Sequence, residues 1–444
     1  MTGLELGKLL KQQVQPVLGC TEPSAIGLAA GLCRWAMGGY APEWLGGNGA
    51  TGPLGPVEHL EVEIDANVYK NAFAVGIPRT GGKVGIELAA ALGSLCNPAL
   101  GLNLFSSAGR EELRQAQAMV EAGLVSVKLD KSVSGLSVAA SCRGGGHEGT
   151  AQIRHQHSLV QGLWQDGVQF YQGSAETVQG PFGTHLEELA RWDLKQVVAA
   201  AESLPEDIYP YLLEGLAINA KAAKRGLAST TGLGVGRVWQ EITTDLGMET
   251  DSLLNQILVE TAAACDARMA GEDIAVMSSA GSGNQGIVVS QPLAVLARLK
   301  PEHEERLGKA LALAHLVTLY ITYYTGYLTP VCGCVVKAGT GAAAGMAYYL
   351  GGDAKVIGGA INNMAANALG ILCDGAKVGC ALKLATSASA AAQCALLALR
   401  GLVVPAGNGV VDASPERTIR NVGRISQSMN QTDSCVLDVL TGAS

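Results

Sequence analysis

The sequence predicts an α+β protein, with a small, mostly antiparallel sheet domain in the N-terminal half and a large all-helical domain after it. From Val125 to Phe170, short alternating apolar and polar runs are separated by turn residues, as in neighbouring strands. After Gly183 the apolar spacing becomes helical and stays so, in segments rich in Ala and Gly. The 444 residues suffice for two or three domains, each with its own hydrophobic core.

We expect three regions along the chain. Helices within residues 1–37 should pack onto the helical domain, residues 38–185 should form the α+β domain, and residues 186–444 the all-helical domain. Residues 38–56 are rich in Gly and Pro and predict a surface excursion or lid. The alternation from Leu60 to Asp65 predicts a half-exposed strand. Helical spacing predicts helices over residues 4–18, 24–37, 84–95, 186–203, 208–224 and 251–270.

Composition excludes several classes of protein. Apolar residues make up 48% of the chain and charged residues 16%, as expected for a well-buried fold. The net charge of -8, with no basic block, argues against a nucleic-acid partner. The first thirty residues show no secretory signal pattern, so we expect a cytoplasmic protein. The eleven cysteines should then be buried, metal-bound or catalytic rather than paired in disulfides.

The 58 glycines, many within helical runs, predict helices that pack with backbone close to backbone. Membrane helices pack in the same way, but the longest apolar runs, 310–327 and 357–372, contain His, Thr, Tyr or Asn. We therefore expect buried helices and no membrane partner. The expected partners are a small-molecule amino-acid substrate and, as the alternative to a single chain, a second copy in a homodimer.

Cys20, Cys332, Cys334 and Cys373 differ from the other cysteines because each lies at a helix-breaking turn beside Gly, Asp or Thr. Their spacing fits no zinc finger, which needs two short-range C-x2-4-C pairs. An iron–sulfur cluster can take thiolates from separate loops. We therefore predict that these four residues converge as metal ligands. Five cysteines without such surroundings are expected to be simply buried: Cys33, Cys96, Cys142, Cys265 and Cys394.

Three protein ligands on a four-iron cluster would leave one iron open. That iron would be a Lewis acid for the carboxylate and the leaving group of a substrate. The protein would then supply a base for the Cα proton and donors that hold the carboxylate.

The loop from Ser278 to Gly286 offers hydroxyls, carboxamides and free backbone amides before an apolar helix. A helix N-terminus of this kind suits a carboxylate, although an ordinary capping loop has the same composition. The expected substrate-binding residues are Ser282, Asn284 and Gln285 in this loop, with Thr21 and Glu22 in the turn of Cys20.

Other chemistries fit less well. Lys337, Lys377 and Lys383 could form a Schiff base with pyridoxal phosphate, but no phosphate cup lies beside them, and no G-x-S-x-G elbow is present. His155 and His157 would share one strand face, where a solvated hairpin is commoner than zinc.

The turn containing Arg79 and Lys83 precedes a helix and could bind an anion, or it could simply connect a strand to a helix.

Four motifs together resemble those of the bacterial and archaeal L-cysteine desulfidases, which are grouped with proteins similar to the α-chain of iron–sulfur L-serine dehydratases. The motifs are Gly19 to Pro23, Gly281 to Gly286, Cys332-Gly333-Cys334 and Cys373 to Cys380. The resemblance covers nearly the whole chain, and the set is specific although each motif alone is weak. The excursion at 38–56 looks like an insertion relative to shorter members.

The resemblance implies a [4Fe-4S] cluster with one open iron, held by three cysteines, and no pyridoxal phosphate. It implies α,β-elimination from a small L-amino acid, which gives pyruvate and ammonia, with sulfide from L-cysteine or water from L-serine. The implied ligands are Cys20, Cys373 and one of Cys332 and Cys334, with Cys332 preferred. Cys380 and Cys435 are reserve ligands.

Lys377 is our first choice as general base, because it lies four residues past a ligand and a helix would bring it to the same face. L-cysteine desulfidase is the leading prediction. The alternatives are an L-serine dehydratase or another β-substituted amino-acid lyase, a non-catalytic iron–sulfur sensor, and a small-residue-rich membrane transporter.

Overall fold

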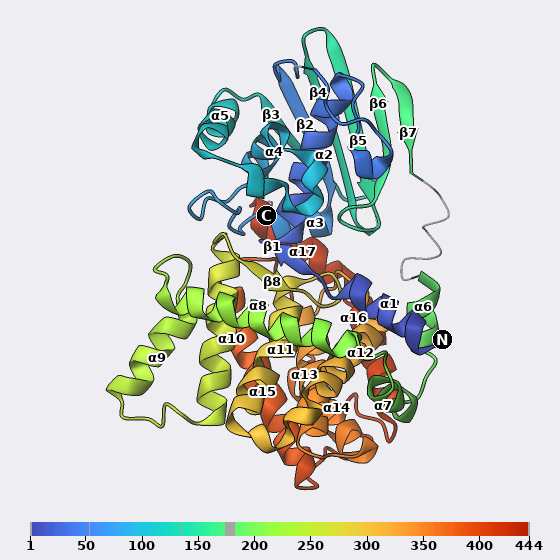
Figure 1. Cartoon of the computed structure of the whole chain (residues 1–444), viewed down its shortest axis with the longest axis vertical. Helices are drawn as coiled ribbons and strands as arrows, with labels where there is room; N and C mark the ends of the chain where they lie inside the picture. Colours follow the sequence, from blue (N-terminus) through green and yellow to red (C-terminus); the bar gives the residue numbers. More distant parts are fainter. Residues whose placement is uncertain (1, 53, 134, 174–182, 443–444) are drawn as a thin grey trace.

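The computed structural model describes residues 2–52, 54–133, 135–173 and 183–442, and it confirms the α+β class (Figure 1). A sheet part lies at one end of the molecule and a larger helical part at the other. Residues 174–182, just before the expected boundary at 185, lie outside the described residues.

One six-stranded sheet has the order β3-β2-β4-β5-β6-β7. Only β2 and β3 are parallel, and the other neighbours are antiparallel, as predicted. The strands are β2 (His59–Asp65), β3 (Val125–Asp130), β4 (Ser137–Gly144), β5 (His147–Arg154), β6 (Val160–Gln165) and β7 (Val168–Gln172).

The sheet packs against helices that share its hydrophobic core. These are α2 (Thr21–Met37), α3 (Ala66–Ala72), α4 (Ile86–Leu95) and α5 (Arg110–Glu121), with the short turns η1 (Glu43–Leu45) and η2 (Pro98–Ser107).

Helix α2 contacts β4, β5 and β6, so it differs from the expectation that the helices of residues 1–37 pack onto the helical part. The reason is Gly149 of β5, which lets the α2 backbone approach the sheet, since a Cβ there would lie 2.0 Å from the Cys33 carbonyl oxygen. Helix α1 (Gly3–Gln13) joins the helical core, through Leu6, Leu9 and Leu10.

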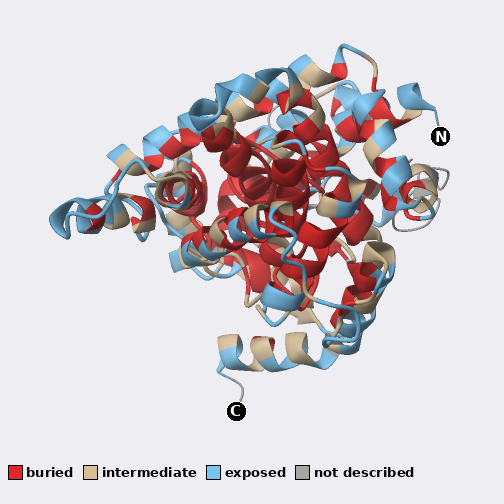
Figure 2. Cartoon of the chain, turned by 90° about the horizontal axis from the view of Figure 1, so that it is seen from below, coloured by how far each residue is buried: buried red, intermediate tan, exposed pale blue. Residues whose placement is uncertain are grey.

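The helical part surrounds a single large core, which forms the buried centre of Figure 2. Its helices are α6 (Gly183–Leu189), α7 (Leu194–Glu202), α8 (Ile208–Ala228), α9 (Val235–Asp245), α10 (Leu253–Met269), α11 (Gly283–Leu299), η4 (Pro301–Arg306), α12 (Leu307–Thr325), the π-helical turn η5 (Cys334–Gly339), α13 (Thr340–Tyr349), α14 (Ala354–Ala368), α15 (Cys380–Leu399), α16 (Pro415–Ser428) and α17 (Asn430–Thr441).

Two expected helices are shorter than their apolar spacing suggests. Residues 186–203 divide into α6 and α7, because the Asp193 side chain accepts from the Gln196 amide and starts a new helix. Residues 4–18 end as a helix at Gln13, and Pro16–Leu18 forms strand β1, which pairs with β8 (Ala275–Met277). A proline cannot donate the helical hydrogen bond, so the chain extends there.

The helices pack with backbone against backbone, as the glycine content predicts. A Cβ at Gly226 of α8 would lie 1.8 Å from the Ala263 carbonyl oxygen of α10. A Cβ at Gly341 of α13 would lie 2.3 Å from the Ala314 carbonyl oxygen of α12.

Helix α15 is the one helix among the described residues that is long and apolar enough to span a membrane, and α4 with η2 passes the same test only as a pair bent by 112°. In α15, 56% of the apolar stretch is buried against the rest of the chain, where it packs on α10, α13 and α14.

The two parts of the chain meet near the C-terminus and the start of α11. Strand β1 joins them by pairing with β8, and α17 lies against α3. A buried ion pair joins Lys70 of α3 to Asp433 of α17. The Gly76 amide donates to the Met269 carbonyl at 3.0 Å.

Candidate active site

Backbone pairing brings Cys332 and Cys373 together from distant parts of the sequence. The Cys332 amide donates to the Ile371 carbonyl at 2.8 Å, and the Cys373 amide donates to the Pro330 carbonyl at 2.7 Å. An antiparallel bridge lies between these two bonds. The two thiols are therefore fixed by the same short two-stranded contact.

Cys380, the first residue of α15, lies in the same group. Burial first, and then the neighbouring Cys332 and Cys373 thiols, raise the pKa of Cys380 to about 11. Its thiol also donates to the Gly375 carbonyl at 3.7 Å. The turn from Cys373 to Cys380 thus returns a third thiol to the pair, and we call Cys332, Cys373 and Cys380 the thiol triad.

The Cys334 thiol donates a hydrogen bond to Cys332, which lowers the pKa of Cys332 to about 6 although burial opposes it. The pKa of Cys334 is raised by the same bond and by burial. The choice between Cys332 and Cys334 as a ligand therefore stays a prediction.

Cys265 of α10 also borders the triad, where the sequence suggested only a buried residue. Burial is the main cause of its raised pKa, and the Cys380 and Cys332 thiols add to it. A position three residues before Arg268 on an otherwise apolar helix gives no motif by which to find it.

Cys20 interacts with a different set of groups from those around the triad. It is the N-cap residue of α2, and its thiol donates to Glu22 Oε2 at 2.9 Å. Burial and the Glu22 charge raise its pKa, and the Arg268 guanidinium opposes them. The strongest charges that act on Cys20 thus come from Glu22 and Arg268 rather than from another cysteine.

Glu22 is a buried carboxylate close to His157 of the sheet part. His157 Nε2 lies 3.6 Å from Glu22 Oε1, and Thr21 Oγ1 donates to Glu22 Oε2 at 3.2 Å. Burial would raise the pKa of Glu22, but His157 and Cys20 lower it to about 2.

The position of His157 corrects the prediction of a strand face shared by His155 and His157. Strand β5 ends at Arg154, and both histidines lie in the turn after it, with His155 exposed.

The first turn of α11 carries Asn284 and Gln285, both buried. Asn284 Oδ1 accepts from Arg268 Nη1 at 2.9 Å, and its amide group contacts Met269 Sδ at 3.3 Å. Gln285 Oε1 is buried without a partner. Ser282 is the half-buried N-cap residue of this helix. The predicted loop therefore offers Gln285 and Ser282 to a ligand, whereas Asn284 is held by the protein.

Lys337 is the lysine most closely associated with the thiols. It is fully buried, and its Nζ donates to the carbonyls of Gly326 at 3.0 Å and Tyr327 at 2.9 Å. Burial lowers its pKa to about 8, and the thiols of Cys334, Cys373 and Cys332 act in the opposite direction. From the sequence, the only role that we raised for Lys337 was a Schiff base with pyridoxal phosphate.

Lys377 does not lie on a helix, so the spacing argument for it is wrong. Residues 374–379 form an irregular turn, and α15 begins only at Cys380. Lys377 Nζ lies 2.5 Å from Asp374 Oδ1, and its side chain is 30% exposed. Lys383 contacts the same carboxylate. Both lysines therefore stabilise the turn that carries Cys373.

Arg79 of the glycine-rich turn is occupied by protein groups. It lies 3.4 Å from Asp273 and donates to the Ser106 carbonyl at 3.1 Å. These contacts favour the simple connection over an anion site there.

The triad fits the ligand set of an iron–sulfur cluster. Among the described residues, no three His, Cys, Asp or Glu side chains converge as the ligands of a single metal ion do. The thiolates of a four-iron cluster bind different irons, so they need not converge on one point. Thiolate is also the ligand that such clusters use, and the triad provides three thiols from two segments of the chain.

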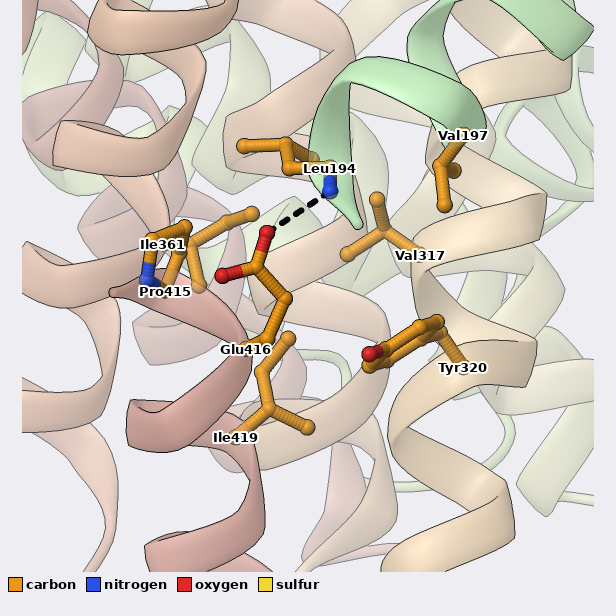
Figure 3. A pocket seen from close by; sticks show the side chains of 8 residues that line it. All are labelled: Leu194, Val197, Val317, Tyr320, Ile361, Pro415, Glu416 and Ile419. Atoms are coloured by element: carbon orange, nitrogen blue, oxygen red, sulfur yellow. Dashed lines mark hydrogen bonds between the residues drawn. The ribbon is translucent and has the colours of Figure 1, made fainter. Parts of the chain in front are cut away.

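Two apolar depressions elsewhere do not contribute to this site. One lies between α7, α12, α14 and α16, where Glu416 accepts from the Leu194 amide at 2.7 Å (Figure 3). That carboxylate faces the first amide of α7 and satisfies it. The second depression is lined by apolar side chains and Thr340. We interpret both as packing features of the helical core.

The fold and the site define an α+β protein with a buried thiol group suited to an iron–sulfur cluster. The family described as serine dehydratase alpha chain matches residues 99–438. A UPF0597 protein of Alkaliphilus metalliredigens is 37% identical over 435 residues, which cover 97% of this chain and 93% of that protein. A UPF0597 protein of Clostridium tetani is 36% identical over 436 residues, which cover 98% and 97%. The chain therefore belongs to the serine dehydratase alpha-chain family.

Membership in this family indicates a lyase of the iron–sulfur dehydratase type, acting in amino-acid degradation. The names of the two relatives state no substrate.

Proposed function

We propose that the protein is an iron–sulfur lyase that removes the β-substituent of a small L-amino acid, with L-cysteine as the leading substrate. The products would be pyruvate, ammonia and sulfide. The observation that carries the proposal is the thiol triad, which joins cysteines of two distant chain segments. Gln285 of α11 lies beside this group, because a Cβ at Gly333 would be 3.2 Å from its Nε2.

Cys332, Cys373 and Cys380 would hold a [4Fe-4S] cluster. This choice replaces Cys20, which the resemblance implied, with Cys380, which interacts with both other members of the triad. Against the effect of burial, the Lys383 ammonium acts to lower the pKa of both Cys332 and Cys373, which favours their ionised forms.

When bound, such a cluster supplies a Lewis acid that eases departure of the β-substituent. The remaining chemistry falls to the protein. Lys337 Nζ is the best-placed proton acceptor for the substrate Cα, because it is buried next to the triad and its pKa of about 8 suits neutral pH. Gln285 Oε1 offers an unpartnered acceptor for the substrate ammonium.

L-cysteine is the leading substrate because the four motifs together resemble those of the L-cysteine desulfidases.

L-serine is the second candidate, because the matched family is that of the serine dehydratase alpha chain. The same residues would serve, with water as the leaving group. The test is a panel of L-cysteine and L-serine with the anaerobically purified protein, in which pyruvate, sulfide and bound iron are measured together. We expect about four iron per chain, and a kcat/KM for L-cysteine above that for L-serine. Higher kcat/KM for L-serine would select the second candidate, and no pyruvate from either substrate would refute the lyase.

A Gln285→Ala variant separates an enzyme from an iron–sulfur sensor. We expect it to keep bound iron and visible absorbance while losing turnover. The matched control is Gln427→Ala, on exposed α16, where the side chain donates only to the Tyr324 carbonyl. Equal activity of the two variants would remove Gln285 from the site.

A further inference from the structure

We propose that Arg268 binds the carboxylate of the substrate beside the first turn of α11. The inference rests on the proposed function, since it names the part of the same site that recognises an amino acid. It assigns a role to a residue that no sequence motif indicated.

Arg268 is a buried cation with few partners. Only 2% of the residue is exposed. The structure gives its guanidinium one hydrogen bond to the described residues, from Nη1 to Asn284 Oδ1 at 2.9 Å, and leaves Nε buried without a partner. A guanidinium carries five donors in a fork that matches a carboxylate. Most of this capacity is unused by the described protein groups.

No carboxylate of the described residues pairs with Arg268. Asp266, on the same helix, accepts instead from the amides of Gly234 at 3.1 Å and Gly236 at 3.0 Å. Glu22 contacts His157 and Cys20. Burying a charge without a counter-charge destabilises a fold, so such a charge is generally paired. A bound anion would provide the pairing that the described chain lacks.

Two helix N-termini add to this positive charge. Arg268 contacts Asn284 in the first turn of α11, and its charge acts on Cys20 at the N-cap of α2. Both helices have 17 residues, so each N-terminus has a developed partial positive charge. Gly283 permits the approach, because a Cβ there would lie 2.4 Å from Arg268 Nε. The sequence thus leaves room for the guanidinium at the end of α11.

The position also fits the chemistry. Cys265, one turn before Arg268 on α10, donates to Asn284 Oδ1 at 3.7 Å, the same oxygen that accepts from Arg268. The Cys380 and Cys332 thiols raise the pKa of Cys265, so the guanidinium shares a hydrogen-bond acceptor with a thiol that borders the triad. A small amino acid held by Arg268 would present its Cα and β-carbon toward the triad.

The test compares L-cysteine with L-cysteinamide, which lacks the carboxylate, by measuring sulfide release from the anaerobic holoenzyme. Wild type should prefer the acid by roughly tenfold to hundredfold, since a charge-assisted hydrogen-bonded pair contributes about 1.5–3 kcal/mol. Arg268→Gln should abolish that preference and raise KM for L-cysteine while bound iron stays unchanged. Arg268→Lys should retain part of that preference, because lysine keeps the positive charge but lacks the forked donors of the guanidinium. The control is Arg298→Gln, an exposed arginine paired with Glu260.

A second readout is binding of L-alanine, which has the carboxylate but no leaving group, measured by calorimetry against L-alaninamide. Arg268→Gln should bind L-alanine at least tenfold more weakly than wild type. An unchanged acid-to-amide ratio in Arg268→Gln would overturn the inference, even if overall activity fell, because a role only in holding Asn284 would affect both substrates equally. If wild type turned over neither L-cysteine nor L-serine, the proposed function would fail. Binding of L-alanine would still decide the role of Arg268.

Discussion

Two lysines near the triad have different environments, and that difference decides their roles. Lys337 is fully buried with two backbone carbonyls as partners, whereas Lys377 is ion-paired with Asp374 at the protein surface. Asp374 keeps Lys383 as a partner when Lys377 is removed. We therefore expect loss of the buried lysine to affect activity more than loss of the half-buried one.

Lys337→Met, which keeps the length of the side chain and removes the amine, should lower kcat for L-cysteine by at least about 100-fold, in line with the loss of a general base. Lys377→Met should lower it by less than about tenfold. Anaerobic sulfide release measures both, and bound iron reports the integrity of the triad. The reverse order of effects would restore Lys377 as the base.

His315 makes stability depend on pH. It is buried on α12, and Nδ1 contacts Ser279 Oγ at 2.9 Å. Burial lowers its pKa from the ordinary value of about 6.5 to about 3. Because the unfolded chain takes up this proton first, the stabilisation is complete above pH 6.5 and is lost as pH falls toward 3.

Between pH 7 and pH 5, the buried neutral His315 should account for a loss of about 2 kcal/mol in the free energy of unfolding. Urea unfolding of wild type and His315→Gln at both pH values measures it, since the difference between the two proteins removes the contribution of the carboxylates. An equal loss in both would show that His315 is accessible to protons in the folded state.

At the scale of elements, helix contacts depend on glycines that have no room for a side chain. Gly226→Ala would place a Cβ 1.8 Å from the Ala263 carbonyl oxygen and force α8 away from α10. We expect it to lower the free energy of unfolding by about 3 kcal/mol. Gly370→Ala is the matched control, because a Cβ there meets nothing within 4 Å.

Chemical denaturation of the two variants provides the measurement, and the control should stay within about 0.5 kcal/mol of wild type. Equal stability of Gly226→Ala and wild type would mean that the two helices can separate at little cost.

The sequence predicted the sheet and most helices, because alternating apolar residues and glycine-rich turns are local signals. It could not indicate that Cys380 lies near Cys332 and Cys373, since that contact depends on a turn that returns Cys380 to the pair. The contacts of His157 with Glu22 and of Arg268 with Asn284 could not be predicted for the same reason. Each joins two elements that are far apart in the sequence, and no spacing pattern indicates such a contact.

At the scale of the whole molecule, the C-terminal helix α17 fastens the sheet part to the helical part. The Lys70–Asp433 pair is buried, with side-chain exposures of 1% and 16%. A second pair, Lys131–Asp438, joins the same helix to the sheet part at 2.9 Å but is exposed, at 52% and 43%. The two pairs therefore form an internal comparison of buried and exposed ion pairs.

Asp433→Asn should lower the free energy of unfolding by about 3 kcal/mol, because it leaves the Lys70 charge buried without a partner. Asp438→Asn should lower it by less than about 1 kcal/mol. Equal effects in anaerobic denaturation experiments would mean that water reaches Lys70.

The most direct test of the account is the iron content of single cysteine-to-serine variants, purified without oxygen and examined by visible absorbance. Cys332→Ser, Cys373→Ser and Cys380→Ser should each lose most of the bound iron, because each removes one thiolate of the triad. Cys20→Ser should keep its iron, as should Cys394→Ser, a buried control on α15. Full iron in Cys380→Ser together with loss of iron in Cys20→Ser would contradict the triad and restore the ligand set implied by the motifs.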